Sequence, residues 1–164
     1  MTAFDDLLAA NASYAATFRD SELTGRAARG LAVVTCMDSR IDPLGLLGLK
    51  PGDAKILRNA GARVTDDVLR TLVLAVYLLG VDRVLVMPHT DCGMAKVTDE
   101  DVHVMTENAG VNTRSLDFHT VPDQDAALRH DLTRIRTSPF LPAGMPVGGA
   151  VYDVSTGRLI PVDL

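Results

Sequence analysis

The run LAVVTC, residues 31–36, decides the fold class of this chain. It is apolar nearly throughout, and it has the length of a single β-strand. A strand with hydrophobic side chains on both faces is typical of a parallel sheet that helices cover on its two sides. We therefore expect this run to form a strand inside such a sheet.

Four further stretches have the composition of strands. Residues 54–58 and 81–87 come next in the chain, and residues 147–154 and 159–162 flank a turn at Thr156-Gly157. Helical patterns separate most of these strands, and that alternation predicts an α/β fold. We expect a mainly parallel central β-sheet flanked by helices, with an N-terminal helical arm.

The clearest helix is predicted between the second and third strands. Residues 65–67 read Thr-Asp-Asp, a helix-start signal with acidic groups where the helix dipole favours them. Residues 68–79 are apolar nearly all round, which predicts a deeply buried helix that Gly80 ends. A second helix is expected over residues 124–138, and a short helix with a loop within residues 93–120.

The N-terminal segment has apolar side chains at helical spacing over residues 2–18. This stripe fits a helix that lies either on a partner subunit or on the chain's own sheet. With 164 residues, the chain has the size of one domain. We expect a single domain over residues 1–164, made of a helical arm (residues 1–29) and an α/β core (residues 30–164).

Composition excludes several classes of protein. Hydrophobic residues make up 47% of the chain and charged residues 23%, which is incompatible with intrinsic disorder. A net charge of −5 disfavours nucleic acid as a partner. No apolar run reaches the length of a membrane span, and the acidic N-terminus argues against a secretory signal, so we expect a cytoplasmic protein without a membrane partner.

The two cysteines, Cys36 and Cys92, cannot form a disulfide framework, and a cytosol would reduce a single bridge. They are therefore buried bystanders, redox thiols or metal ligands. Cys36 ends one predicted strand, and His89 and Cys92 follow the end of another. Because the carboxyl ends of parallel strands share one edge of a sheet, the three side chains converge if these two strands are neighbours.

Two thiolates and one imidazole suit Zn²⁺, and three protein ligands leave the open fourth position of a catalytic site. Zinc there would lower the pKa of a bound water to about 7. Asp38 could take the fourth position or accept a hydrogen bond from zinc-bound hydroxide, and Arg40 could keep Asp38 ionised. Two other interpretations are a Cys36 nucleophile with His89 as its base, or a buried apolar Cys36 with His89 as a capping or surface histidine.

Three short motifs bear on that choice. Residues 36–40 read CMDSR, residues 58–61 read RNAG, and residues 89–92 read HTDC. In this order and at this spacing they resemble the Cys-x-Asp-Ser-Arg, Arg-Asn-Ala-Gly and His-x-x-Cys segments of the β-class carbonic anhydrases. The chain is similar to a compact, short-chain subgroup of that family.

The resemblance implies a carbonate dehydratase, a zinc lyase that hydrates CO₂ reversibly to bicarbonate and a proton by attack of zinc-bound hydroxide. Position by position, it implies that Cys36, His89 and Cys92 hold one Zn²⁺ per chain. Asp38 and Arg40 match the family's catalytic pair. The resemblance also implies a closed state in which Asp38 is itself the fourth zinc ligand.

The resemblance further implies a small-molecule substrate, CO₂ or bicarbonate, and a homodimer or dimer of dimers. Relatives on this scaffold hydrolyse carbonyl sulfide or carbon disulfide, so such a hydrolase is the alternative activity. A non-catalytic, zinc-binding regulatory protein is a third hypothesis, which the intact Asp38 and Arg40 disfavour. Among the residues outside the ligand set, Asp91 is either an outer partner of the site or a solvent-facing loop carboxylate. The remaining histidines are expected on the surface or in loops: His103, His119 and His130.

Overall fold

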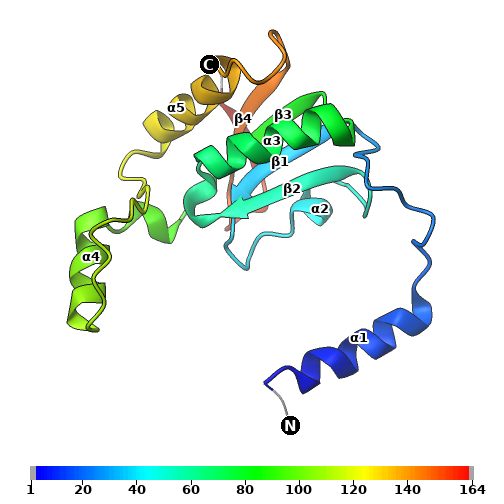
Figure 1. Ribbon diagram of the computed structural model, residues 1–164, viewed down its shortest axis with the longest axis horizontal. Coiled ribbons are helices and arrows are strands. Elements are labelled where there is room, and N and C mark those ends of the chain that lie inside the picture. The colour runs from blue at the N-terminus through cyan, green and yellow to red at the C-terminus, as the bar shows by residue number, and fades with distance from the viewer. Residues whose placement is uncertain (1–2, 163–164) are drawn as a thin grey trace.

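A computed structural model describes residues 3–162 of the chain. Its centre is a five-stranded sheet with the strand order β2-β1-β3-β4-β5 (Figure 1). The first four strands run parallel, and β5 is antiparallel to β4. The strands are β1 (Leu31–Cys36), β2 (Ala54–Asn59), β3 (Arg83–Met87), β4 (Val147–Tyr152) and β5 (Leu159–Val162). The α/β fold expected from the sequence is confirmed.

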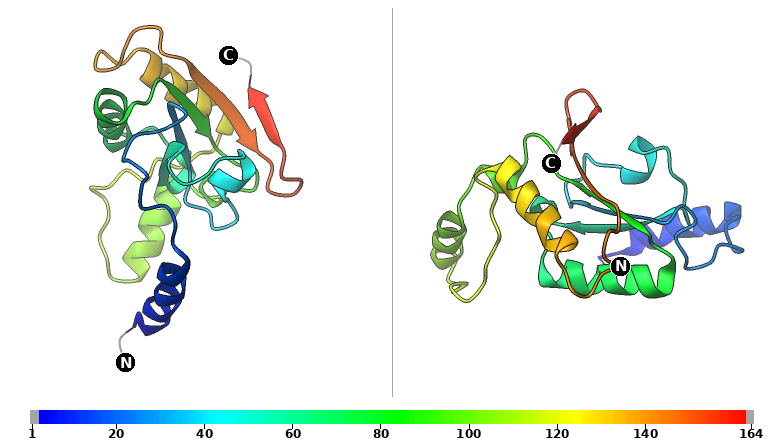
Figure 2. Two further views of the ribbon diagram at one scale, coloured as in Figure 1. Left: turned by 90° about the vertical axis from the view of Figure 1, so that its right-hand side faces the viewer. Right: turned by 90° about the horizontal axis from the view of Figure 1, so that it is seen from above.

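Helices cover the two faces of the sheet unequally. The α-helices of the described region are α1 (Asp5–Thr17), α2 (Pro43–Leu46), α3 (Asp66–Leu79), α4 (Asp99–Asn108) and α5 (Gln124–Arg136), and two 3₁₀ turns span Ala60–Ala62 and Gly93–Ala95. Figure 2 shows α3 and α5 against one face of the sheet and the short α2 on the opposite side. The larger apolar cluster lies under α3 and α5, and the smaller one packs against Leu46 and Leu47 at the end of α2.

Strand β1 is the best-buried strand of the sheet. It pairs with β2 on one side and β3 on the other, and every residue after Leu31 is buried. The hydroxyl of Thr35 donates a 2.8 Å hydrogen bond to the carbonyl of Met87 in β3, which satisfies a polar group inside the sheet. This interior position holds the last residue of β1, Cys36, against the end of β3.

Helix α3 begins and ends where the sequence predicts, but its burial differs from the prediction. Thr65 caps its start by accepting from the backbone N–H of Val68, and Gly80 ends it in the left-handed conformation, with φ of 76°. Only one stripe of the helix is buried: Val68, Leu72 and Ala75. The opposite side is exposed: Leu74, Tyr77 and Leu78. The expectation of burial all round was wrong, because no part of the chain that the structure describes covers the outer face of α3.

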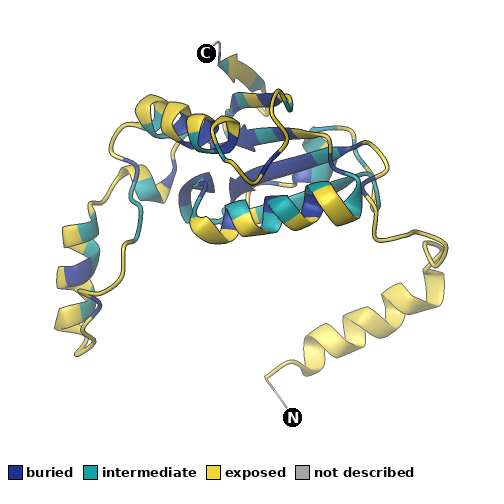
Figure 3. Ribbon diagram, turned by 45° about the horizontal axis from the view of Figure 1, so that its top comes forward, coloured by how far each residue is buried: buried dark blue, intermediate teal, exposed yellow. Residues whose placement is uncertain are grey.

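Helix α1 projects away from the sheet, and none of its residues is buried (Figure 3). Its apolar stripe is therefore exposed, with side chains at Phe4, Leu7, Leu8 and Tyr14 that are each more than half accessible. Residues 19–30 form turns and irregular backbone that lead into β1. Over residues 3–162, no helix has both the length and the apolar character that crossing a membrane requires.

Helix α4 and the returning loop form an appendage beside the sheet (Figure 1). Asp99, the first residue of α4, ties the loop down. Its carboxylate accepts hydrogen bonds from the backbone N–H of Phe118 at 2.7 Å, from that of Thr120 at 3.0 Å and from the Thr120 hydroxyl at 2.5 Å. These bonds, that of the Thr120 hydroxyl foremost, hold the pKa of Asp99 well below its usual range.

Replacing Asp99 by alanine is expected to destabilise the protein by about 1–3 kcal/mol, because two backbone N–H groups of the loop lose their acceptor. Since the folded-state pKa of Asp99 is lowered, its contribution is complete above the usual carboxyl pKa and is lost as pH falls through the folded-state value. Urea unfolding of the variant and the parent at neutral pH measures the difference.

Asp125→Ala is the matched control for this prediction. Asp125 also lies in the first turn of a helix, but its one side-chain bond is an exposed pair with Arg129. The control is expected to cost about 0.5 kcal/mol or less. Equal losses in the two variants would show that the loop bonds of Asp99 add nothing beyond the charge at a helix start.

Candidate metal centre

The candidate metal centre lies at the carboxyl ends of β1 and β3. These strands are parallel neighbours, with Thr35 opposite Met87, so the residues that follow the two strands meet at one edge. One ligand atom from each of Cys36, His89 and Cys92 lies within 4.8 Å of the other two. The convergence predicted from strand ends is confirmed for these three side chains.

His89 is oriented as a metal ligand would be. Its Nδ1 lies 2.8 Å from the carbonyl oxygen of Thr90, so that nitrogen carries the proton as a donor and Nε2 presents a lone pair. Among the described residues, His89 Nε2 is the buried side-chain nitrogen or oxygen that has no hydrogen-bond partner. A buried polar atom without a partner is costly, and a metal ion would satisfy this one. The histidine therefore fits a metal.

Neighbouring backbone holds the His89 loop in place. The side chain of Gln124, the first residue of α5, donates a 2.8 Å hydrogen bond to the carbonyl of His89. Tyr152, at the end of β4, exchanges backbone bonds with Pro88 and Thr90 at 2.9 Å each. The ring is completely buried, so its orientation is determined by packing as well as by these bonds.

Both cysteines are unpaired and buried, with 4% and 5% of their surface exposed. Burial raises the pKa of the Cys92 thiol, and the neighbouring Cys36 and Asp38 raise it further against the effect of a backbone bond at Met94. A divalent cation is the natural counter-charge, because it favours the thiolate form that burial opposes. The donor set of two sulfurs and one imidazole nitrogen fits zinc.

Asp38 and Arg40 form a bidentate pair beside the three candidate ligands. Arg40 donates from Nε to Asp38 Oδ1 at 3.0 Å and from Nη2 to Asp38 Oδ2 at 2.7 Å. These bonds hold the pKa of Asp38 well below its usual range, so the carboxylate acts only as an acceptor. Asp38 Oδ2 lies 3.8 Å from His89 Nε2, which puts the carboxylate at the edge of the ligand cluster.

Arg58 shapes the loop that carries this pair. Its guanidinium donates to three backbone carbonyls, those of Cys36 at 3.0 Å, Ile41 at 3.2 Å and Asp38 at 2.6 Å. The RNAG motif singles out Arg58, but sequence reasoning assigns it no task. Its partners are backbone carbonyl oxygens of another segment. Every residue has such an oxygen, so the sequence does not indicate which ones Arg58 contacts.

Two other expectations have clear outcomes. Asp91 accepts hydrogen bonds from Arg40 at 2.9 Å and Lys96 at 2.5 Å, so it is connected to the site rather than only to solvent.

The expectation that His103 lies on the surface or in a loop was wrong, because it is in α4 and only 9% exposed. Its Nδ1 lies 2.9 Å from the Thr113 hydroxyl, and its ring packs against Phe118. His119, in a loop, and His130, exposed on α5, have the accessible positions expected of them.

Sequence comparison finds one family match. The family model described as carbonic anhydrase matches residues 31–159, which is more than half of the chain. Beta-carbonic anhydrase 1 of Mycobacterium tuberculosis (strain H37Rv) is 39% identical over 160 residues, which cover 97% of each protein. A carbon disulfide hydrolase of Acidianus sp. is 31% identical over 157 residues, which cover 80% of this chain and 76% of that protein.

Structure comparison finds the same fold. A crystal structure of a carbonic anhydrase from Streptococcus mutans superposes with a TM-score of 0.93 at 38% sequence identity and covers 99% of both chains. The similarity includes the strands that bring Cys36, His89 and Cys92 together, since it extends over nearly the whole chain.

Proposed function

The chain belongs to the β-carbonic anhydrase family, and from that premise we propose that it hydrates CO₂ reversibly to bicarbonate and a proton. The observation that carries the proposal is the buried Cys36, His89 and Cys92 cluster with a bidentate Asp38–Arg40 pair at its edge. A purely structural metal site has no need for such a pair.

We propose that Cys36, His89 and Cys92 together hold one Zn²⁺ per chain. When bound by three protein ligands, zinc lowers the pKa of water at its open position to about 7 and so supplies a nucleophile near neutral pH. The free Nε2 lone pair of His89 and the two unpaired, buried thiols support this assignment.

Asp38 is proposed to orient the reacting groups. Arg40 keeps the Asp38 carboxylate ionised and donates to both of its oxygens. Because an ionised carboxylate only accepts hydrogen bonds, a group that binds to Asp38 beside His89 Nε2 must carry a proton. An acceptor in that place favours a donor over an unprotonated anion. Arg40 acts through Asp38, since its bonds fix the plane and charge of the carboxylate.

The direct test is metal content and CO₂ hydration on the purified protein. About one zinc per chain and rapid hydration, measured by stopped-flow proton release, are expected. A zinc-loaded protein that hydrates neither CO₂ nor a sulfur analogue would overturn the proposal and favour the binding or regulatory hypothesis.

Carbon disulfide or carbonyl sulfide hydrolysis is the second candidate. A curated relative that is 31% identical is named a carbon disulfide hydrolase, and attack on a linear heterocumulene uses the same ligand set. Parallel assays with CO₂, carbonyl sulfide and carbon disulfide separate the two. A kcat/KM for either sulfur substrate that exceeds that for CO₂ would make the hydrolase the principal activity.

We propose that the protein is a cytoplasmic homodimer, or a dimer of dimers, in which residues 1–29 act as an arm on the core of residues 30–164. The support is helix α1. A 13-residue helix with no buried residue is marginal in water on its own, and the described residues 3–162 leave its apolar stripe exposed. Two free thiols in a metal site suit the reducing cytoplasm.

Replacing both Leu7 and Leu8 by aspartate is expected to convert the dimer to monomer, because charges then face the surface that covers α1. Sedimentation velocity at matched concentrations measures the change. Ser13→Asp is the control, since Ser13 lies on the opposite side of the same helix. A double variant that keeps the parent's sedimentation coefficient would exclude α1 from the subunit contact.

A further inference from the structure

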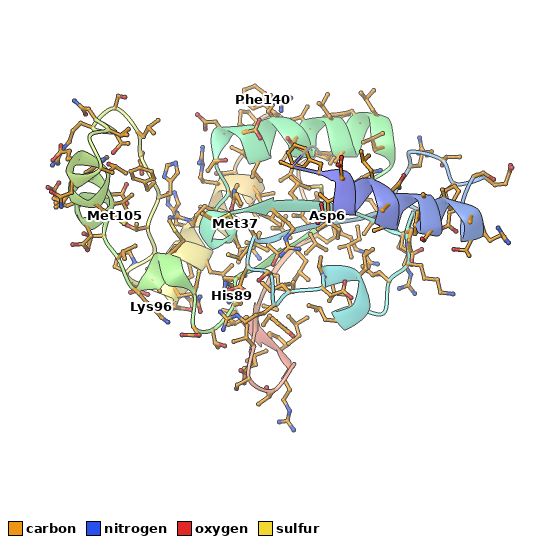
Figure 4. All side chains as sticks on the ribbon, turned by 90° about the horizontal axis from the view of Figure 1, so that it is seen from below. Asp6, Met37, His89, Lys96, Met105 and Phe140 are labelled. Carbon is orange, nitrogen blue, oxygen red and sulfur yellow. The ribbon has the colours of Figure 1, made fainter. Side chains whose placement is uncertain are left out.

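Four charged side chains form a continuous chain at the rim of the metal centre. Asp38 pairs with Arg40, Arg40 pairs with Asp91, and Asp91 pairs with Lys96. The signs of the charges alternate, so each inner member has an opposite charge on both sides. Lys96 and His89 are labelled in Figure 4, which shows the side chains with the molecule seen from below.

Arg40 uses its guanidinium in two directions. Nε and Nη2 face Asp38, while Nη1 donates to Asp91 Oδ2 at 2.9 Å and Nη2 also donates to the Asp91 carbonyl at 3.2 Å. Its side chain is 45% exposed, so packing alone does not hold it. Asp91 therefore supplies the second anchor that restricts rotation of the guanidinium.

Asp91 is itself held from the other side. Lys96 donates to its remaining oxygen, Oδ1, at 2.5 Å, so each carboxylate oxygen has its own cation. The backbone at Asp91 has φ of 57°, a left-handed conformation that aspartate and asparagine adopt more readily than most residues. Asp91 lies between the proposed ligands His89 and Cys92 in the sequence. The loop that carries these two ligands therefore also fixes Arg40, which belongs to the loop after β1.

An isolated pair at this exposure would contribute little, because exposed ion pairs are screened and pay side-chain entropy. The four-membered arrangement differs, since it includes a bidentate arginine and a network of several charges. Its consequence is positional rather than stabilising. The direction of the Asp38 carboxylate at the ligand cluster depends on where Arg40 is held.

We propose that Asp91, supported by Lys96, is a positioning residue that locks Arg40 and thereby keeps Asp38 aimed beside His89 Nε2. Lys96 acts only through Asp91. The catalytic part of this inference rests on the proposed CO₂ hydration, whereas the locking of Arg40 is a property of the folded chain.

Asp91→Asn tests the proposal with little change in shape, because asparagine keeps the left-handed backbone accessible. Hydrogen exchange at the Arg40 Nε–H, followed by NMR of ¹⁵N-arginine-labelled protein with and without zinc, is expected to become about fivefold faster or more, as for the loss of one hydrogen bond. In the zinc-loaded protein kcat is expected to fall about 10-fold with little change in KM. Zinc content is expected to stay at the parent's value.

Lys96→Met, and the double variant Lys96→Met with Asp91→Asn, test whether Lys96 acts through Asp91. Lys96→Met alone is expected to have a smaller effect on both readouts, and to have none once Asp91 is already asparagine, because coupled residues are not additive. Asp125→Asn, at an exposed aspartate paired with Arg129 on α5, is expected to change neither readout.

The outcomes separate this inference from the proposed function. If the parent protein does not hydrate CO₂, the proposed function fails, and exchange at Arg40 still decides whether Asp91 locks the guanidinium. If the parent is active and Asp91→Asn keeps its exchange rate and kcat, the inference fails while the function stands. Additive effects of Lys96→Met and Asp91→Asn would also overturn it.

Discussion

Replacing His89 by alanine is expected to remove the zinc and to lower the CO₂ hydration activity by more than about 100-fold. Replacing even a residue that only hydrogen-bonds to a metal ligand typically lowers metal affinity or activity by about 10–100-fold. The reason is geometric: His89 Nε2 is the nitrogen of the cluster, and two thiols alone do not make a zinc site. Metal analysis of the purified variant and stopped-flow hydration measure the two losses. Cys36→Ala and Cys92→Ala are expected to behave alike.

His103→Ala is the matched control for this prediction. Both histidines are buried, and each has one ring nitrogen within hydrogen-bond distance of an oxygen, but His103 lies in α4, away from the ligand cluster. His103→Ala is expected to lower stability and to keep about one zinc per chain. Retention of zinc by His89→Ala would contradict the proposed ligand set.

Replacing Asp38 by asparagine is expected to lower kcat by about 100-fold or more while most of the zinc is retained, in the range of a lost acid–base partner. The amide has nearly the same shape as the carboxylate, but it has one acceptor oxygen where Arg40 needs two. The amide nitrogen also offers a donor where the proposed function requires an acceptor. Zinc content and steady-state kinetics of the same preparation measure both effects.

Asp125→Asn serves as the control here too, because it removes one exposed carboxylate that pairs with Arg129 on α5 and not with Arg40. It is expected to keep the parent's kcat. Full activity of Asp38→Asn would exclude the proposed role of the Asp38–Arg40 pair, and loss of zinc in that variant would instead make Asp38 a ligand.

The sequence predicts the part of the site that depends on strand ends. Residues 31–36 form β1 with the expected bounds, because an uninterrupted apolar run has one stable place in a sheet covered on both faces. Cys36 and His89 then converge because β1 and β3 are parallel neighbours. The hydrophobic pattern and the ends of the strands are local properties, so they can be read from a single sequence.

The sequence does not predict contacts whose partners lie on a distant segment of the chain. Arg58 acts on backbone carbonyls, which have no residue signature, and Asp91 meets Arg40 only after two loops are folded. His103 is buried because the loop after α4 folds back onto it. The apolar outer face of α3 was expected to be buried, since the sequence shows that a surface is apolar but not whether the same chain covers it.

The strand order also determines when a newly made chain could first bind the proposed zinc. The ribosome delivers Cys36 with β1, then all of β2 and α3, and only afterwards His89 and Cys92. Until β3 has paired beside β1, Cys36 is a single thiol with no nearby ligand. With Cys36, His89 and Cys92 as the proposed ligands, zinc could be captured only late in synthesis or after it, and it would stabilise the non-local pairing of β1 with β3.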